Sequence, residues 1–278
     1  GYTQVSTLAE GLSQKPEVVF ITNPSAAHME VAISCAEAGL DIFVEKPLSH
    51  RLDDSQRLLD LVRQKDLVLM VGYQTRYHPG LIDAIDVFRN GDYGSVISAC
   101  FEWGTFLPDH HPYEDYKGSY AARDDLGGGV TLGLIHEIDL IYTFFGMPKH
   151  ISAIGGNLST LEMTAEDTVV ALMAFERNNG CVPVSLKLSY AQTYETRRFT
   201  IQFDRAVMVC DLGKNSLDVY GAGREMILTK QYKAFERNDL FVDQMSDFLQ
   251  KVESRDTGLS SLKAGIDTLT IAQQIKGI

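Results

Sequence analysis

Three short apolar runs, separated by helical patterns, constrain the fold of this chain more than any other feature. The runs VVFIT (18–22), IFV (42–44) and LVLMV (67–71) contain no charged residue, which is typical of strands buried on both faces of a sheet. Apolar residues at helical spacing occupy 28–38 and 58–62, between the runs. Strand, helix and strand joined by short loops predict a parallel α/β sheet covered on both faces.

The second half of the chain follows a different period. From Val182 to Tyr190 apolar residues alternate with polar ones, which predicts a strand with one buried face. Asn179-Gly180 indicates a hairpin turn before it. Further strands are expected at 150–154, 169–175, 199–203 and 207–210, and helices near 240–252 and 262–275. This half is therefore predicted to be an α+β domain with a mostly antiparallel, open-faced sheet.

The segment between the two halves has no clear period. Residues 104–126 are rich in Asp, His, Tyr and Pro, and a loop this long in a compact domain is usually functional or disordered. The aromatic residues of this segment favour a functional loop over a disordered one. The triglycine 127–129 then opens an apolar helix that we expect to run to about Phe145.

A glycine-rich phosphate loop is missing from the sequence. The G-x-G-x-x-G pattern of dinucleotide-binding domains does not occur, and Gly127, Gly129 and Gly133 only approximate it. The chain starts at Gly1 without a methionine, and a short helix (8–12) precedes the first apolar run. We expect a strand–helix–strand unit to precede this segment in the parent protein.

Composition excludes several classes of function. A net charge of −12 over 278 residues, 45% of them hydrophobic, argues against nucleic-acid binding, which requires a basic surface. No apolar run is long enough for a membrane helix, and no signal peptide is evident. The four cysteines lack C-x-x-C spacing and are predicted to be reduced core residues of a cytoplasmic protein: Cys35, Cys100, Cys181 and Cys210.

Glu45, Lys46 and Pro47 directly follow the second apolar run. A solvated turn would explain the charges, although turns favour Gly, Asn, Asp and Ser. A ligand site would explain them equally well, because ligands bind at the carboxyl edge of a parallel sheet. The bond before Pro47 is a candidate for the cis form.

The order of several motifs resembles one enzyme family. Asn23-Pro24, His28, Glu45-Lys46-Pro47, GYQTRY (72–77) and GGGVTLGLIHEIDL (127–140) together resemble the glucose–fructose oxidoreductase / inositol 2-dehydrogenase (Gfo/Idh/MocA) family. The resemblance covers essentially the whole chain. Residues 107–129 look like the branch of sugar and nucleotide-sugar dehydrogenases.

This resemblance implies roles for two residues. Lys46 would lie beside the nicotinamide and hydrogen-bond the substrate hydroxyl and a cofactor ribose, with Glu45 orienting it or holding the ribose. His136 would be the acid/base group, and an imidazole with a pKa near 6.5 suits the removal of a hydroxyl proton. A histidine satisfied within the core is the alternative.

The remaining site residues follow from the same resemblance. The cofactor site would be lined by Thr22, Asn23, Pro24, His28, Glu45, Lys46 and Gln74. The substrate side would include Arg76, Tyr120, Arg123 and Asp139. A metal site is not predicted, because adjacent histidines such as His110 and His111 project differently and HEID is not H-E-x-x-H.

One position departs from the family pattern. Many relatives carry an aspartate three residues before the histidine, where this chain has Gly133. Three outcomes are open: Lys46 and His136 suffice, a carboxylate from Glu137, Asp139 or Asp109 takes over, or catalysis is weakened.

The sequence therefore predicts a Rossmann-type domain (1–98) that lacks its first unit, followed by a substrate-binding and oligomerisation domain (99–278). The last helix is a candidate to pack back on the first domain. The predicted activity is hydride transfer between NAD or NADP and a sugar or nucleotide-sugar hydroxyl. The alternative is a non-catalytic sugar-binding or scaffold protein. The open face of the second sheet predicts a homodimer, or a dimer of dimers.

Overall fold

A small parallel sheet forms one part of the computed structural model, which describes residues 3–177 and 180–277. Its strands β1 (Val18–Ile21), β2 (Asp41–Glu45) and β3 (Leu69–Gly72) lie in that order, with the β2 strand in the centre. Short connections and right-handed crossovers bring all three carboxyl ends to one edge. The three apolar runs thus form the predicted parallel strands.

Helices cover both faces of this sheet. Helices α2 (His28–Ala38) and α3 (Ser55–Gln64) pack together on one face. On the other face, Phe248 of α7 (Arg237–Ser254) meets Phe43 with ring centroids 5.5 Å apart. A short helix, α1 (Leu8–Ser13), precedes β1. Double-sided burial explains the continuous apolar runs of β2 and β3. The prediction is wrong for β1, which lies at the edge of the sheet and leaves Phe20 45% exposed.

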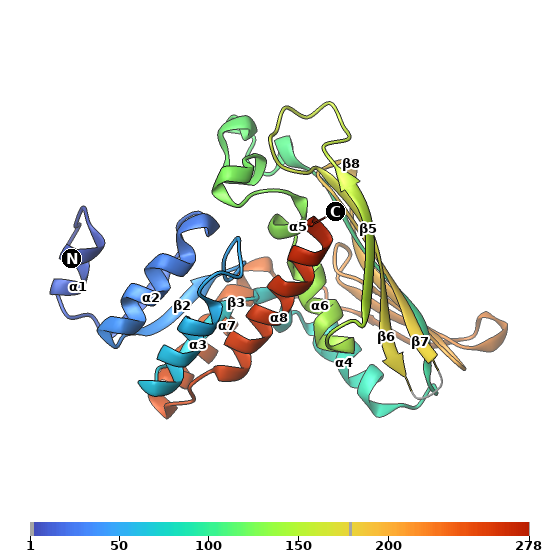
Figure 1. The fold of residues 1–278 in the computed structure, drawn as a ribbon. Helices are drawn as coiled ribbons and strands as arrows, with labels where there is room; N and C mark the ends of the chain where they lie inside the picture. Colours follow the sequence, from blue (N-terminus) through green and yellow to red (C-terminus); the bar gives the residue numbers. More distant parts are fainter. Residues whose placement is uncertain (1–2, 178–179, 278) are drawn as a thin grey trace.

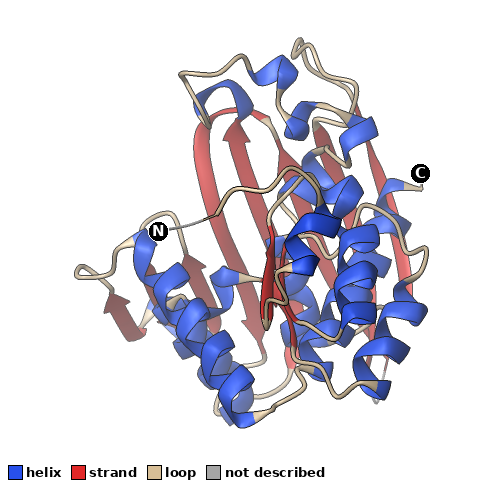
Figure 2. Ribbon diagram, turned by 90° about the vertical axis from the view of Figure 1, so that its left-hand side faces the viewer, coloured by secondary structure: helices blue, strands red, loops and turns tan. Residues whose placement is uncertain are grey.

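A curved sheet of eight strands forms the other part (Figures 1 and 2). Its strand order is β11-β10-β9-β8-β4-β7-β6-β5, and every neighbouring pair is antiparallel except β4 and β7. This confirms the predicted mostly antiparallel sheet. The strands are β4 (Val96–Phe106), β5 (His150–Gly156), β6 (Thr168–Arg177), β7 (Gly180–Ser189), β8 (Ala191–Phe203), β9 (Val207–Asp211), β10 (Ser216–Tyr220) and β11 (Met226–Gln231).

All labelled helices in Figure 1 lie on one side of the eight-stranded sheet. Helices α4 (Pro79–Asn90) and α6 (His136–Phe145) contact it directly, and Phe144 of α6 lies 5.3 Å from Phe199 of β8 between ring centroids. The other side carries exposed apolar residues, among them Ile154 and Leu172. The sheet is open-faced, as predicted.

Helix α8 (Leu259–Lys276) connects the two parts of the fold. It packs against β3 and α3 of the parallel sheet and against α6 and β5 on the other side. Figure 1 shows it running between the two sheets, with its carboxyl end near β5. The last helix does return to the parallel sheet, and α7 packs there as well.

Several local predictions are wrong. The helix expected from Gly129 to Phe145 is interrupted after α5 (Val130–Gly133), and α6 starts afresh at His136. Strand β4 enters the segment expected to be a loop, whose remainder forms four 3-10 turns: η3 (Leu107–Asp109), η4 (Tyr116–Gly118), η5 (Tyr120–Ala122) and η6 (Asp124–Leu126). Strands β10 and β11 were not expected.

Two further predictions have mixed outcomes. All four cysteines are free, but Cys100 and Cys181 are exposed rather than in the core. The hairpin turn at Asn179-Gly180 falls partly outside the described residues, although β6 and β7 pair antiparallel around it. No helix in residues 3–177 or 180–277 combines the length and hydrophobicity needed to cross a membrane.

Phe248 allows a test of the packing of α7 against the parallel sheet. Its side chain is fully buried against the parallel sheet, so Phe248→Ala should lower the free energy of unfolding by about 3–5 kcal/mol. Phe241→Ala, on the same helix but 37% exposed, should cost about 0.5 kcal/mol or less. Chemical denaturation of both variants measures the difference. Equal losses would contradict the packing of α7 described above.

Candidate active site

The carboxyl ends of β1, β2 and β3 carry most of the predicted cofactor residues. Thr22, Asn23 and Pro24 follow β1 and are exposed, so their polar groups are accessible to a ligand. Glu45 ends β2, and the Lys46–Pro47 bond that follows is cis, as predicted. These side chains share one edge of the sheet because the strands are parallel.

Lys46 reaches from this edge to the second part of the fold. Its ammonium Nζ donates a hydrogen bond to the carbonyl oxygen of Gly133, 2.8 Å away. Its backbone N–H donates to Glu45 Oε2 at 3.2 Å, and burial raises the pKa of that carboxyl. The end of β2 is therefore tied to the residue that closes α5.

His28 is buried and bound on both sides. Its Nδ1 lies 2.8 Å from the carbonyl oxygen of Pro47, and its Nε2 lies 2.7 Å from that of Asn23. Both ring nitrogens thus face backbone carbonyls of the loops after β1 and β2, and the nitrogen that carries the proton donates to one of them. We therefore assign His28 a role in positioning these loops, rather than the direct cofactor contact expected from the sequence.

His136 is the first residue of α6 and only 2% exposed. The ring of Tyr73 approaches it edge-on, with centroids 5.9 Å apart, and that of Trp103 lies at 6.4 Å. Burial, followed by the charges of Lys46 and Arg197, lowers its pKa well below the ordinary 6.5. Its Nδ1 is buried and has no hydrogen-bond partner within the part of the chain that the structure describes, so this nitrogen of the neutral imidazole is free to bind a ligand.

Two buried carboxylates follow His136 on α6, and each is paired with an arginine. Glu137 accepts from Nε of Arg197 at 2.7 Å, and this guanidinium also donates to the Thr75 hydroxyl at 3.0 Å. Asp139 is fully buried and binds Arg76 in a bidentate pair at 2.8 and 2.5 Å. Carboxylates in the first turn of a helix are also favoured by its dipole.

These pairs change the predicted substrate contacts. Asp139 lies behind Arg76 and has no exposed surface, so the structure gives it the role of holding that guanidinium. Arg76 keeps a side chain that is 32% exposed. Glu137 and Asp139 are each committed to an arginine, which leaves neither free to replace the aspartate expected at position 133.

The other two predicted substrate residues lie at the end of the long loop. Tyr120 is exposed and begins η5. Arg123 is exposed and pairs with Asp125 at 2.5 Å, so its guanidinium points to a neighbour on its own turn. Arg123 is not among the cations that lower the pKa of His136, which are Lys46, Arg197, Arg76 and Arg237.

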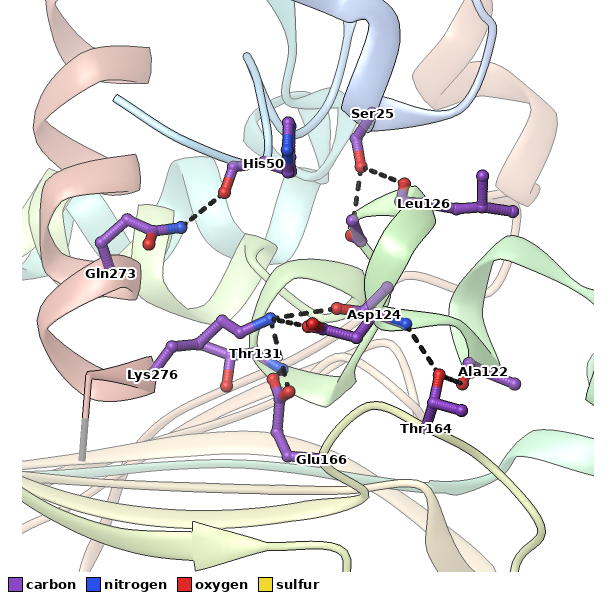
Figure 3. Close-up of polar contacts among 12 residues, drawn as sticks. Ser25, His50, Ala122, Asp124, Leu126, Thr131, Thr164, Glu166, Gln273 and Lys276 are labelled. Atoms are coloured by element: carbon purple, nitrogen blue, oxygen red, sulfur yellow. Dashed lines mark hydrogen bonds and ion pairs between the residues drawn. The ribbon is translucent and has the colours of Figure 1, made fainter. Parts of the chain in front are cut away.

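The turn that leads into the triglycine packs against the loop after β1, where Ser25 donates a hydrogen bond to the carbonyl oxygen of Leu126 (Figure 3). Gly127 has φ +78°, and a Cβ there would come within 2.6 Å of His50 Cβ, so glycine is required by both backbone and space. The hydroxyl of Ser25 donates to the Gly127 carbonyl at 3.1 Å. Lys276 of α8 lies 3.2 Å from Asp124 and 3.4 Å from Glu166 in the same region.

The edge described above fits a dinucleotide. Gln74 Oε1 and His136 Nδ1 are buried without a partner among the described residues, and Thr22 and Asn23 are exposed at the strand end. A ligand with hydroxyl and amide groups would satisfy such atoms. No group of three or more His, Cys, Asp or Glu side chains in the described ranges is placed to bind a metal.

Sequence reasoning missed Trp103, Tyr190 and Arg197. Arg197 lies 3.9 Å over the Trp103 ring, measured from guanidinium carbon to ring centroid. Both come from strands of the large sheet, far along the chain from His136. We expected no strand at 96–106 and one only from 199 onward, so neither residue was placed on the sheet.

Comparison with known proteins identifies the family. The model of an oxidoreductase family with an NAD-binding Rossmann fold matches residues 1–73, and that of the Gfo/Idh/MocA C-terminal domain matches residues 82–209. The chain belongs to the Gfo/Idh/MocA family. The predicted family and the NAD-binding domain are thus confirmed.

Two curated relatives illustrate the similarity. Levoglucosan dehydrogenase of Pseudarthrobacter phenanthrenivorans is 34% identical over 145 residues, which cover 51% of this chain and 36% of that protein. UDP-N-acetylglucosamine 3-dehydrogenase of Acidithiobacillus ferrooxidans is 23% identical over 96% of this chain and 80% of its own length. The first two curated relatives are matched over only 36% and 39% of their length.

Solved structures confirm the fold. The apo form of levoglucosan dehydrogenase superposes with a TM-score of 0.82 at 19% identity, covering 98% of this chain and 80% of that one. Its complex with NADH and levoglucosan gives a TM-score of 0.80 at 21% identity, covering 94% and 77%.

The environment of His136 predicts its titration. Its folded-state pKa lies below 6.5, so the imidazole should be neutral at pH 7 and take up a proton only in more acidic solution. Because the unfolded chain binds that proton at higher pH, this residue's contribution to stability should decline as the pH falls below 6.5. NMR of labelled histidines, assigned with His136→Asn, measures the midpoint. A midpoint above 6.5 would contradict the buried, cation-flanked setting.

Proposed function

We propose that this protein is an NAD-dependent dehydrogenase that oxidises a hydroxyl group of a sugar or nucleotide sugar. The observation that carries the proposal is the bond from Lys46 to Gly133, three residues before His136. Through this bond the ammonium of Lys46, at the carboxyl edge of the parallel sheet, reaches the junction between α5 and α6. The imidazole of His136, whose Nδ1 has no partner among the described residues, starts α6 at the same junction.

The two side chains have complementary tasks. The neutral imidazole of His136 accepts the proton of the substrate hydroxyl as the CH–OH group becomes a carbonyl. The ammonium of Lys46 donates a hydrogen bond to the substrate oxygen, where negative charge develops. When bound, the nicotinamide ring supplies the acceptor for the hydride. Arg76 is the remaining candidate for contact with the substrate from the parallel sheet.

Relatives support a sugar as the substrate class. One solved relative is a levoglucosan dehydrogenase in complex with NADH and levoglucosan, and one curated relative is a UDP-N-acetylglucosamine 3-dehydrogenase. Both names describe oxidation of a sugar or nucleotide sugar. We propose that residues 1–98 hold the cofactor, that residues 99–278 bind the sugar and mediate assembly, and that the protein is cytoplasmic.

Lys46→Ala tests the chemistry. Turnover should fall by at least about a hundredfold because the substrate oxygen loses its cationic donor. The thermal midpoint should change little, since Lys46 contributes one hydrogen bond and little apolar contact. Reduced nicotinamide is followed by absorbance while the full-length protein is screened against sugars and nucleotide sugars.

Lys233→Ala is the matched control, because Lys233 is exposed and distant in sequence from both motifs. Full activity of Lys46→Ala would contradict the assigned role. Tight sugar binding by the wild-type protein with no turnover of any sugar would support the alternative, a non-catalytic sugar-binding protein.

Assembly through the open sheet face is the second part of the proposal. On β7, Val184 and Leu186 are buried toward the helices, while Lys187 is exposed on the other face. Exposed Ile154 and Leu172 lie on neighbouring strands, and such faces often form interfaces between two copies.

Light scattering on the full-length protein should therefore give the mass of a dimer or of a dimer of dimers. Leu172→Asp should dissociate it, because a carboxylate would be buried in the interface. Leu249→Asp, on exposed α7 surface, should leave the mass unchanged. A monomer mass for the wild-type protein would rule out this assembly.

A further inference from the structure

The hydroxyl of Tyr190 occupies the position that a side chain on Gly133 would take. A Cβ built on Gly133 would overlap the Tyr190 hydroxyl oxygen and lie 2.9 Å from Tyr190 Cζ. No side chain at position 133 can coexist with this placement of the phenol. The hydroxyl of Tyr190, the residue directly after β7, occupies this space instead.

Tyr190 is held in place by its surroundings. It is 2% exposed, its backbone N–H donates to the Asp167 carbonyl at 2.8 Å, and its ring meets that of His110 edge-on with centroids 5.7 Å apart. Burial, Tyr120 and Glu166 act on its hydroxyl, and no hydrogen bond from residues 3–177 or 180–277 does. A buried phenol usually has a polar partner, so this hydroxyl is available to a ligand.

The charge state of this group differs from that of a carboxylate. Burial, followed by the nearby Tyr120 and Glu166, raises the pKa of Tyr190 well above 10. The phenol is therefore neutral throughout the physiological range and can both donate and accept a hydrogen bond. It cannot take up the proton that His136 removes.

We propose that Tyr190 is a substrate-positioning residue that acts beside Gly133. Its hydroxyl hydrogen-bonds a sugar hydroxyl next to the one that is oxidised. Gly133 contacts both Tyr190 and Lys46, so the phenol and the ammonium act from adjacent points around one residue. This inference rests on the proposed dehydrogenase function and leaves His136 as the sole proton acceptor.

Tyr190→Phe removes the hydroxyl and keeps the ring. The KM for the sugar should rise about tenfold, as expected for the loss of one hydrogen bond. The dissociation constant for NADH, measured by fluorescence titration, should be unchanged because the hydroxyl faces the sugar. The thermal midpoint should also stay the same. Tyr232→Phe, remote from this site and bonded to Asp83, is the control and should leave KM unchanged.

An exchange of the two positions supplies the decisive result. Gly133→Asp alone should destabilise the protein, since its side chain collides with the phenol. Combined with Tyr190→Ala, which removes the ring as well as the hydroxyl, the aspartate has room, and the double variant should recover most of the sugar KM that Tyr190→Ala loses. A merely structural tyrosine would not be rescued in this way.

The outcomes separate the two proposals. If the wild-type protein oxidises no sugar, the proposed function fails. If it is active and Tyr190→Phe keeps the wild-type KM, or if the exchange does not restore it, the role of Tyr190 is overturned while the dehydrogenase function stands.

Discussion

Two buried carboxylate–arginine pairs at the start of α6 fix the rest of the site. Isolated buried charges are very costly, so Glu137 and Asp139 each require a cation, and the loss of one partner typically costs about 3–5 kcal/mol. Arg197 comes from the large sheet and Arg76 from the turn after the parallel sheet. The first turn of α6 is therefore held from both parts of the fold, with His136 at its start.

This arrangement also sets the electrostatics of the site. The carboxylates pair with Arg197 and Arg76, while burial, followed by the charges of Lys46 and of these two arginines, lowers the pKa of His136 and keeps it neutral. A neutral base next to an ammonium suits removal of a hydroxyl proton, because the anionic oxygen that forms is stabilised while the base is ready to accept. Because Tyr190 is also neutral, it adds a polar contact at Gly133 without a competing base.

The sequence predicted those parts of the structure that depend on local patterns. The parallel strands were evident because residues such as Ile42 and Val44 are buried on both faces, and the cis bond at Pro47 followed from its motif. The break between α5 and α6 was missed because Leu134 and Ile135 are apolar and continue the helical pattern, whereas the break follows from how the junction packs. Arg197 and Tyr190 were missed since their partners lie some sixty residues away along the chain, at Glu137 and Gly133.

A crystal structure of the full-length protein with NADH and a sugar found in the substrate screen would test the central claim most directly. The account predicts that the hydroxyl to be oxidised lies within hydrogen-bond distance of both Lys46 Nζ and a ring nitrogen of His136. The Glu137–Arg197 and Asp139–Arg76 pairs should be intact in the same complex. A sugar bound away from this junction, or a His136 ring that faces only the protein core, would contradict the account.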